Sequence, residues 1–263
     1  MMKKLRHALF LLVLIQIFVF AAFPNTAKAA HKNEWVTVNE KMVYYGANGK
    51  KVTGIQKIGK SQYYFNSSGV QRVGWQKIDE DYYFFRIANG TGGYMLRGKT
   101  QNGIELKSNG KASLTSEAKK KLTVLVKAQK LVEANTKPLM TTSEKLKAMW
   151  KVIIKYKYLG SPAFNSKGSW DVTYAKAMFT DKHGSCYHYA AAFAYLANAV
   201  GCKDCKAVSS GGHGWAEVNG YIYDPSWQNV DGANHSYYRV DPKLSGKGGR
   251  PQYSTHRTYV KKI

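Results

Sequence analysis

Acidic residues are scarce in this chain. Only 16 Asp and Glu stand against 40 Lys and Arg, which gives a formal net charge of +24 at pH 7. A charge of this size attracts polyanions. A generally basic, solvated surface without a dedicated binding patch explains the composition equally well.

Cysteine is also scarce, and its count is odd. The chain has three cysteines, Cys186, Cys202 and Cys205. In an oxidising compartment an odd count leaves at least one thiol without an internal disulfide partner. Cys202 and Cys205 are close enough in sequence to pair with each other, which would leave Cys186 as a free thiol.

Long hydrophobic runs are absent except at the start of the chain. Residues 8–23 form one apolar run behind Lys3, Lys4 and Arg6, and the run is followed by the small-residue pattern Ala27-Lys28-Ala29. This pattern predicts a secretory signal peptide over residues 1–29, with a single membrane anchor as the alternative. Because no second run is long enough to span a bilayer, we expect no integral membrane segment after signal removal. For an exported protein, anionic wall polymers or headgroups fit the basic charge better than nucleic acid does.

An internal repeat dominates the next part of the chain. Trp35, Ile55 and Trp75 lie 20 residues apart, and an aromatic pair follows each of them nine and ten residues later. Each unit has the pattern of a short strand, a turn, an aromatic strand and a glycine turn, which predicts one β-hairpin per repeat. A degenerate fourth unit is expected over residues 99–110. Since a single hairpin cannot bury its own face, the units should stack into a solenoid.

These repeats resemble the cell-wall-binding family, the choline-binding and glucan-binding repeats of Gram-positive surface proteins. The segments Trp75-Gln76-Lys77-Ile78 and Tyr82-Tyr83-Phe84 carry the likeness best. The resemblance implies that choline or a glycan is held between rings of successive hairpins, choline by cation–π attraction and a glycan by stacking of its sugar faces. The implied partner is a cell-wall polymer, either teichoic acid or a glycan. In the alternative interpretation the rings only hold the solenoid together. The candidate ligand-binding rings are those of Trp35, Tyr44, Tyr45, Tyr63, Tyr64, Trp75, Tyr82 and Tyr83.

Helical periodicity begins after the repeats. Residues 116–135 carry apolar side chains at helical spacing and end before Lys137-Pro138. A second helix is expected from Thr142 to the Gly160-Ser161-Pro162 break, and its apolar stripe is explained fully as a core face. Farther along, Gly184-Ser185-Cys186 opens an alanine-rich helix. Cys186 is therefore expected in a first helical turn, where the helix dipole favours a thiolate.

A second motif supplies a base for that thiol. Residues 211–218 and 221–225 are expected to form two strands joined by the hairpin signal Asn219-Gly220. Counting from this turn pairs residue 218 with 221 and residue 215 with 224. His213 and Asp224 then become diagonal neighbours on one face, about 7–8 Å apart at the backbone. The sequence thus predicts a His–Asp pair on a rigid hairpin.

A helix-start cysteine followed by this hairpin resembles the transglutaminase-like superfamily of papain-type cysteine enzymes. The likeness extends over residues 143–227 and is carried by Gly184-Ser185-Cys186, by residues 213–218 and by Asp224-Pro225-Ser226-Trp227. It implies that Cys186 is the nucleophile, that His213 is its base and that Asp224 orients the histidine. The backbone N–H of Cys186 should be one oxyanion donor, and Trp170 and Tyr174 are candidates for the second.

Two alternatives to this assignment remain open. His183 could serve as the base from its loop before the helix, whereas His188 is expected to point away from the thiol. Cys202-x-x-Cys205 with His213 could indicate zinc, but the spacing lacks a second clean ligand pair. We therefore expect no metal and no other cofactor, and either a local disulfide or two plain thiols at Cys202 and Cys205.

Together these patterns predict an α+β protein with a β-hairpin repeat solenoid over residues 30–112 and a papain-like, transglutaminase-like domain over residues 113–263. The predicted function is acyl transfer from an amide of a protein or peptide through a Cys186 thioester. The acceptor is either water, as in a cysteine protease or other hydrolase, or an amine, as in a cross-linking acyltransferase. The alternative is a non-catalytic wall-binding or adhesion protein. With no LPxTG signal before Ile263, we expect secretion and non-covalent attachment to the wall.

Overall fold

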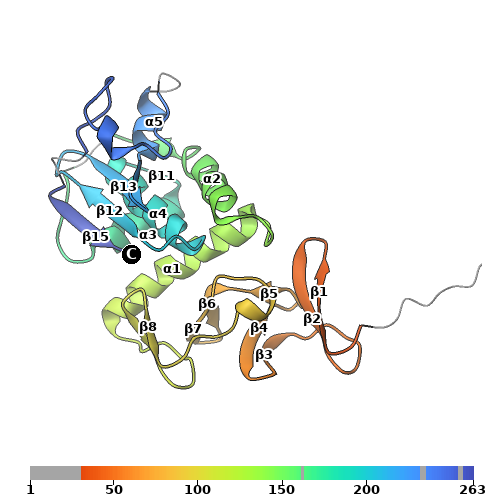
Figure 1. Ribbon diagram of the computed structural model, residues 1–263. Coiled ribbons are helices and arrows are strands. Elements are labelled where there is room, and N and C mark those ends of the chain that lie inside the picture. The colour runs from red at the N-terminus through yellow and green to blue at the C-terminus, as the bar shows by residue number, and fades with distance from the viewer. Residues whose placement is uncertain (1–30, 161–162, 232–234, 254–256) are drawn as a thin grey trace, which may run out of the picture. The chain divides into compact units, whose positions relative to one another are not determined.

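The computed structural model describes residues 31–160, 163–231, 235–253 and 257–263. The expected signal peptide, residues 1–29, lies outside the described residues. Mixed α+β structure with hairpins first and a helical and sheet domain after them confirms the predicted fold class (Figure 1). Of the helices described, none combines the length and apolar character needed to cross a membrane.

The repeats form antiparallel hairpins with the 20-residue spacing expected from the sequence. In each of the first three hairpins, the residue at the Trp35 position of the repeat pairs across the strands with the first residue of the aromatic pair. Trp35 thus pairs with Tyr44, and Trp75 pairs with Phe84. The fourth, degenerate unit also forms a hairpin. The strands of the four units are β1 (Glu34–Val38), β2 (Lys41–Tyr45), β3 (Gly54–Ile58), β4 (Ser61–Phe65), β5 (Gln71–Arg72), β6 (Gly74–Ile78), β7 (Asp81–Phe85), β8 (Lys99–Gln101) and β9 (Ile104–Leu106).

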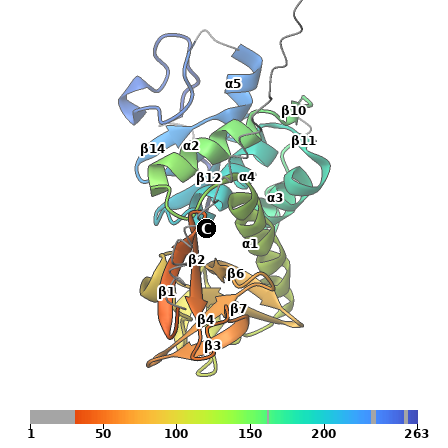
Figure 2. The same ribbon diagram turned by 90° about the vertical axis from the view of Figure 1, so that its right-hand side faces the viewer.

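Helix α1 (Ser116–Asn135) packs directly on the third hairpin (Figures 1 and 2). Its N-cap is Thr115, whose side chain accepts the N–H of Ala118, so the helix begins at residue 116, as expected from the sequence. Gly74 has a φ of +71°, and a Cβ there would lie 2.0 Å from Oε1 of Gln129 on α1. The positive φ favours glycine at this position, and a larger residue would also displace the amide of Gln129.

The core is continuous between the hairpins and the helices. Trp75, Phe84 and Leu106 belong to the same buried cluster as Leu122 and Leu125 of α1. The apolar area removed from water at this contact stabilises both parts together. The expected boundary between residues 112 and 113 therefore crosses one shared core rather than a linker.

The catalytic candidates lie in the remaining elements, where α4 is the central helix. Its side chains are nearly all buried, and it packs on α1, α2, α3, α5 and the strands β12 and β13. The sheet beside it has the strand order β14-β13-β12-β15. The elements are α2 (Thr142–Ile153), β10 (Lys157–Tyr158), α3 (Trp170–Asp181), β11 (His183–Gly184), α4 (Cys186–Ala199), β12 (Cys205–Ser209), β13 (Gly214–Val218), β14 (Tyr221–Tyr223), α5 (Pro225–Asp231) and β15 (Tyr259–Lys262).

Some boundaries differ from those expected. The second helix ends at Ile153, because the following residues turn into the short strand β10 before the Gly160 break. The strand expected from residue 211 begins only at Gly214, since residues 210–213 form a turn in which Ser210 and His213 exchange backbone and side-chain hydrogen bonds. The tail, which carries no motif, adds β15 to the sheet edge beside β12.

Candidate active site

Cys186 is the first residue of α4 and is 1% exposed. Ser185 precedes it as the N-cap in extended conformation, so the sequence Gly184-Ser185-Cys186 opens the helix as expected. The positive end of the α4 dipole points at the sulfur position and stabilises negative charge there. The surrounding burial removes competing water from the thiol.

His213 lies in the connection from β12 to β13, next to the start of α4. Its Nε2 is 2.6 Å from Oδ2 of Asp224, and its ring is also hydrogen-bonded to the side chain of Cys186. Because Nε2 is engaged by Asp224, Nδ1 is the ring nitrogen left for the thiol. The side chain of His213 is 21% exposed, so one part of the ring remains open to a substrate.

Asp224 is fully buried, at 0% exposed, and accepts hydrogen bonds on both carboxylate oxygens. Oδ1 accepts the hydroxyl of Ser226 at 2.7 Å and the N–H of Trp227 at 3.0 Å. Oδ2 accepts the hydroxyl of Tyr253 at 2.9 Å in addition to the imidazole of His213. Four donors on one buried carboxylate fix its orientation and offset the cost of burying its charge.

In the His213–Asp224 pair, the pKa of the histidine is raised and the pKa of the aspartate is lowered, so both shifts favour an ion pair. Burial on its own would lower the pKa of His213, but the charge and hydrogen bond of Asp224, together with Cys186, raise it to about 10. Burial would raise the pKa of Asp224, whereas His213, Trp227 and Ser226 bring it below its ordinary value. At neutral pH the histidine is therefore held as an imidazolium beside a carboxylate.

The second oxyanion donor expected from the sequence has two candidates, both on α3. Trp170 is 2% exposed and packs edge-to-face on Phe164 at 5.2 Å. The hydroxyl of Tyr174 accepts the N–H of Asn165 at 3.0 Å, and its ring is 5.7 Å from that of Tyr187. Both residues thus lie near the start of α4, and their role as oxyanion donors stays a prediction.

The alternatives to the Cys–His–Asp assignment lie apart from this arrangement. His183 is exposed in β11, where it pairs with Lys157. Cys202 and Cys205 are buried free thiols at the far end of α4, and the thiol of Cys205 donates to the carbonyl of Cys202 at 3.5 Å. Within the described ranges, no three His, Cys, Asp or Glu side chains come together in a metal-binding group.

Comparison with known families assigns both parts of the chain. Residues 128–232 match the model of the transglutaminase-like superfamily, and residues 52–99 match the model of the choline-binding repeat. The chain therefore contains a transglutaminase-like domain. Both resemblances inferred from the sequence, and their order along the chain, are confirmed. The combination indicates a cell-wall-associated enzyme of the cysteine class.

Solved structures are similar to 30–32% of this chain. Choline binding protein F from Streptococcus pneumoniae is 25% identical, with 30% of this chain and 26% of that chain covered at a TM-score of 0.28. The choline-binding domain of CbpL from Streptococcus pneumoniae is 22% identical over 31% of this chain and 44% of that chain, with a TM-score of 0.27. The Cpl-1 endolysin from phage Cp-1 is 28% identical over 32% and 25%, with a TM-score of 0.22. This chain thus spans about a quarter of the first structure's length. A comparison with curated proteins finds no match.

The rings expected to bind a wall ligand fall into two groups. Tyr63, Trp75 and Tyr83 are buried, and Trp75 donates its indole N–H to Oδ1 of Asn102 at 2.8 Å. The other candidates keep part of their surface exposed. This second group consists of Trp35, Tyr44, Tyr45, Tyr64 and Tyr82.

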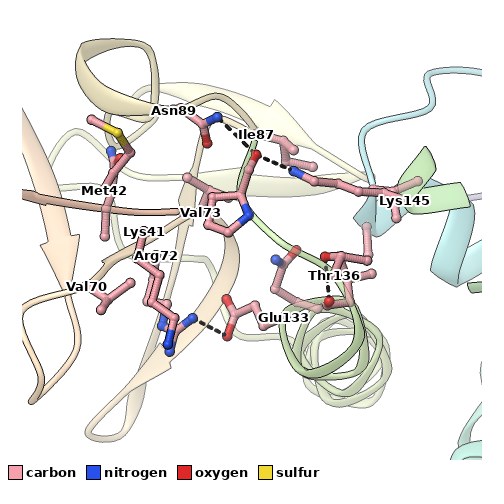
Figure 3. A pocket seen from close by; sticks show the side chains of 16 residues that line it. Lys41, Met42, Val70, Arg72, Val73, Ile87, Asn89, Glu133, Thr136 and Lys145 are labelled. Atoms are coloured by element: carbon pink, nitrogen blue, oxygen red, sulfur yellow. Dashed lines mark hydrogen bonds and ion pairs between the residues drawn. The ribbon is translucent and has the colours of Figure 1, made fainter. Parts of the chain in front are cut away.

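A separate pocket lies between the hairpins and helices α1 and α2 (Figure 3). Its volume is about 90 Å³, and none of the candidate catalytic residues lines it. Arg72 and Glu133 form an ion pair at 3.6 Å on one side, and Lys145 donates to the carbonyl of Pro138 at 3.1 Å on another. Burial lowers the pKa of Lys145. The pocket's polar groups thus largely satisfy one another.

Several residues of the transglutaminase-like domain were not foreseen from the sequence. Tyr253 donates to Asp224 and packs on Trp215 at 5.2 Å. Trp227 lies edge-on to His213 at 5.8 Å. Tyr187, next to the nucleophile candidate, donates its hydroxyl to the carbonyl of Gly211 at 2.8 Å, and burial raises its pKa to about 12. For Trp227 its place in the Asp-Pro-Ser-Trp motif was the available signal, whereas Tyr253 has no local signal at all.

Gly214 provides a test of how closely β13 must approach α4. A Cβ at Gly214 would lie 3.0 Å from Cδ1 of Tyr187, 3.2 Å from its Cα and 3.3 Å from the carbonyl carbon of Cys186. Since two of these atoms are backbone, Gly214→Ala should push His213 and Cys186 apart by a few tenths of an ångström. We expect a reaction rate at Cys186 reduced by about tenfold or more, because small misplacements of reacting groups are costly.

Gly212→Ala is the matched control, because nothing lies within 4 Å of a Cβ at that position. It should react at the wild-type rate. The measurement is the rate of Cys186 modification by an acylating reagent in the two variants. Equal rates in both variants would contradict the close-approach argument.

Proposed function

We propose that the chain is an exported, wall-associated enzyme that transfers an acyl group from an amide of a protein or peptide through a thioester on Cys186. The observation that carries this proposal is the buried Asp224 carboxylate 2.6 Å from His213, whose ring is in turn hydrogen-bonded to Cys186. Adhesion alone does not require a buried ion pair beside a cysteine thiol. Perturbed titrations of this kind cluster at functional sites.

The mechanism follows from the groups present. The proton of the Cys186 thiol resides on His213 as the imidazolium, and the Cys186 thiolate attacks the amide carbonyl carbon. The backbone N–H of Cys186 donates to the developing oxyanion. His213, held as an imidazolium by Asp224, gives its proton to the leaving amine, so the C–N bond breaks and a thioester remains. Water or a lysine amine then attacks the thioester and loses its proton to His213, and the C–S bond breaks to release the Cys186 thiolate.

We infer that the hairpins supply the wall attachment. Choline binding protein F has been crystallised with a peptidoglycan analogue, and the Cpl-1 endolysin with choline. By analogy, the partly exposed rings of Trp35, Tyr44 and Tyr64 are proposed to contact a choline or glycan group. Buried Trp75 serves the core in this proposal. Loss of wall co-sedimentation in Trp35→Ala, with acylation of Cys186 retained, would support it, and unchanged sedimentation would contradict it.

The catalytic proposal is tested by trapping the thioester. The full chain without its first 29 residues is mixed with p-nitrophenyl acetate, with and without a primary amine, and digested for mass analysis. The acetyl group should appear on Cys186, be released by hydroxylamine, and be absent in Cys186→Ala. Faster turnover with the amine present indicates an amine acceptor, and unchanged turnover indicates water. An acetyl group on another residue, or equal turnover by Cys186→Ala, would overturn the proposal.

A further inference from the structure

His188 lies two residues after Cys186, and its side chain folds back onto Ser185, the residue before Cys186. The N–H of Ser185 donates to Nδ1 of His188 at 3.2 Å, and the hydroxyl of Ser185 lies 3.0 Å from the same nitrogen. We propose that His188 is a positioning residue that holds the Ser185–Cys186 peptide group in the orientation needed to bind an oxyanion. This inference rests on the proposed function. It also gives a role to a histidine that the sequence placed away from the thiol.

The His188 ring is held on two sides. A Cβ on Gly184 would lie 2.5 Å from Cγ and 2.6 Å from Cβ of His188, so a glycine is required under the ring. On the other side, the ring of Tyr174 on α3 meets it edge-to-face at 4.7 Å. Tyr174 is itself fixed by the Asn165 N–H, which donates to its hydroxyl. The ring therefore has little freedom to leave Ser185.

The role requires His188 to be neutral. Nδ1 can accept from Ser185 only when it carries no proton, so the ring proton must be on Nε2. Burial lowers the pKa of His188, and the nearby His183 lowers it further, while Asp181 acts in the opposite direction. The net shift is downward, so the accepting form prevails at neutral pH. A glutamate or glutamine at this third helical position makes the same back-bond in ordinary capping boxes.

The link to catalysis is the peptide group between Ser185 and Cys186. Its N–H belongs to Cys186 and is the proposed oxyanion donor. An oxyanion donor must point at the place where charge develops, and its removal costs about 10²–10³ in rate. His188 does not touch the reacting atoms. It fixes the orientation of the Ser185–Cys186 peptide group, whose N–H contacts the oxyanion, by binding to Ser185.

Two reactions of Cys186 separate this role from ordinary helix capping. Alkylation by iodoacetamide develops no oxyanion, whereas acylation by p-nitrophenyl acetate does. His188→Leu should therefore slow acylation by about 10–100-fold, while alkylation stays within about threefold of wild type. His188→Gln should restore acylation to within about fivefold, because its amide oxygen can accept the Ser185 N–H. Gly184→Ala, which displaces the ring, should act like His188→Leu.

His183→Gln is the matched control, because His183 is a neighbouring histidine that is exposed. It should leave both rates unchanged. Equal slowing of both reactions in His188→Leu, or wild-type acylation in that variant, would overturn the inference. If His188→Leu does not fold, the ratio of the acylation rate to the alkylation rate is compared between His188→Gln and Gly184→Ala, and this ratio tests the inference instead. Failure of the wild type to acylate at Cys186 would instead overturn the proposed function.

Discussion

Replacing Asp224 by asparagine will slow acylation of Cys186 by roughly 10²–10⁴-fold at pH 7. The negative charge that raises the pKa of His213 to about 10 is lost in this variant, while the burial that lowers that pKa remains. His213 is then neutral at pH 7 and no longer supports a thiolate. An asparagine also turns an amide N–H₂ toward donors that need an acceptor. The measurement is the acylation rate from pH 5 to pH 10.

Tyr253→Phe is the control variant, because it changes the hydrogen bonding around Asp224 but keeps the negative charge. It removes one of the four donors to Asp224 and leaves the carboxylate in place. We expect acylation within about tenfold of wild type, since the other three hydrogen bonds remain. A similar loss in Tyr253→Phe and Asp224→Asn would show that packing around the carboxylate, rather than its charge, controls His213.

Stability should follow the same titration. A histidine whose pKa is raised on folding stabilises the fold fully below its unfolded value of about 6.5, and this contribution disappears as the pH rises through the folded value. The difference in unfolding free energy between wild type and Asp224→Asn should therefore shrink from pH 7 to pH 10. Each pKa unit corresponds to about 1.4 kcal/mol. A difference that is constant over this interval would contradict the raised pKa of His213.

Trp75→Ala will destabilise the protein by about 3–5 kcal/mol, because it empties a large buried site in the shared core. Trp75 is 3% exposed and packs edge-to-face on Phe84 at 5.3 Å. Its indole N–H donates to Asn102, which in turn donates to Asn198 on α4. The loss should therefore reach the helix that carries Cys186, and urea unfolding followed by circular dichroism measures it.

Trp35→Ala is the comparison within the same repeat position. Trp35 keeps part of its surface exposed and contacts rings of the first two hairpins, among them Tyr44 and Tyr63. We expect Trp35→Ala to lower the free energy of unfolding by less than half as much as Trp75→Ala does. If Trp75→Ala instead unfolds in two steps, with the later step unchanged from wild type, the hairpins and helices do not share one core.

Local patterns were sufficient to predict the hairpins and one contact of the site. The 20-residue period predicted each hairpin, because alternating side chains and a glycine turn determine a strand pair locally. The register from Asn219-Gly220 paired Val218 with Tyr221, as observed. The same register predicted that His213 and Asp224 are close, and their side chains are hydrogen-bonded, although His213 lies just before β13 and Asp224 just after β14.

Contacts between distant segments could not be predicted in this way. Tyr253 reaches Asp224 across 29 residues of chain, and Tyr237 accepts the N–H of Asp224 through its backbone carbonyl. Neither contact has a periodic signal, because hydrogen bonds of this kind depend on where the tail folds. Periodicity also does not distinguish a ring that faces solvent from one that faces another helix. Trp75 therefore shares the pattern of Trp35 although it is buried.

The tight fit of the third hairpin on α1 bears on how such proteins could be rearranged by recombination. Gly74 leaves room for Gln129, and the side chain of Gln76 donates to Glu133 at 2.9 Å. A foreign third hairpin would have to match these helix residues, so it cannot be exchanged freely as a cassette. The first two hairpins carry less of this constraint. Shuffling of wall-binding repeats between lineages should therefore leave its crossovers upstream of Gly74.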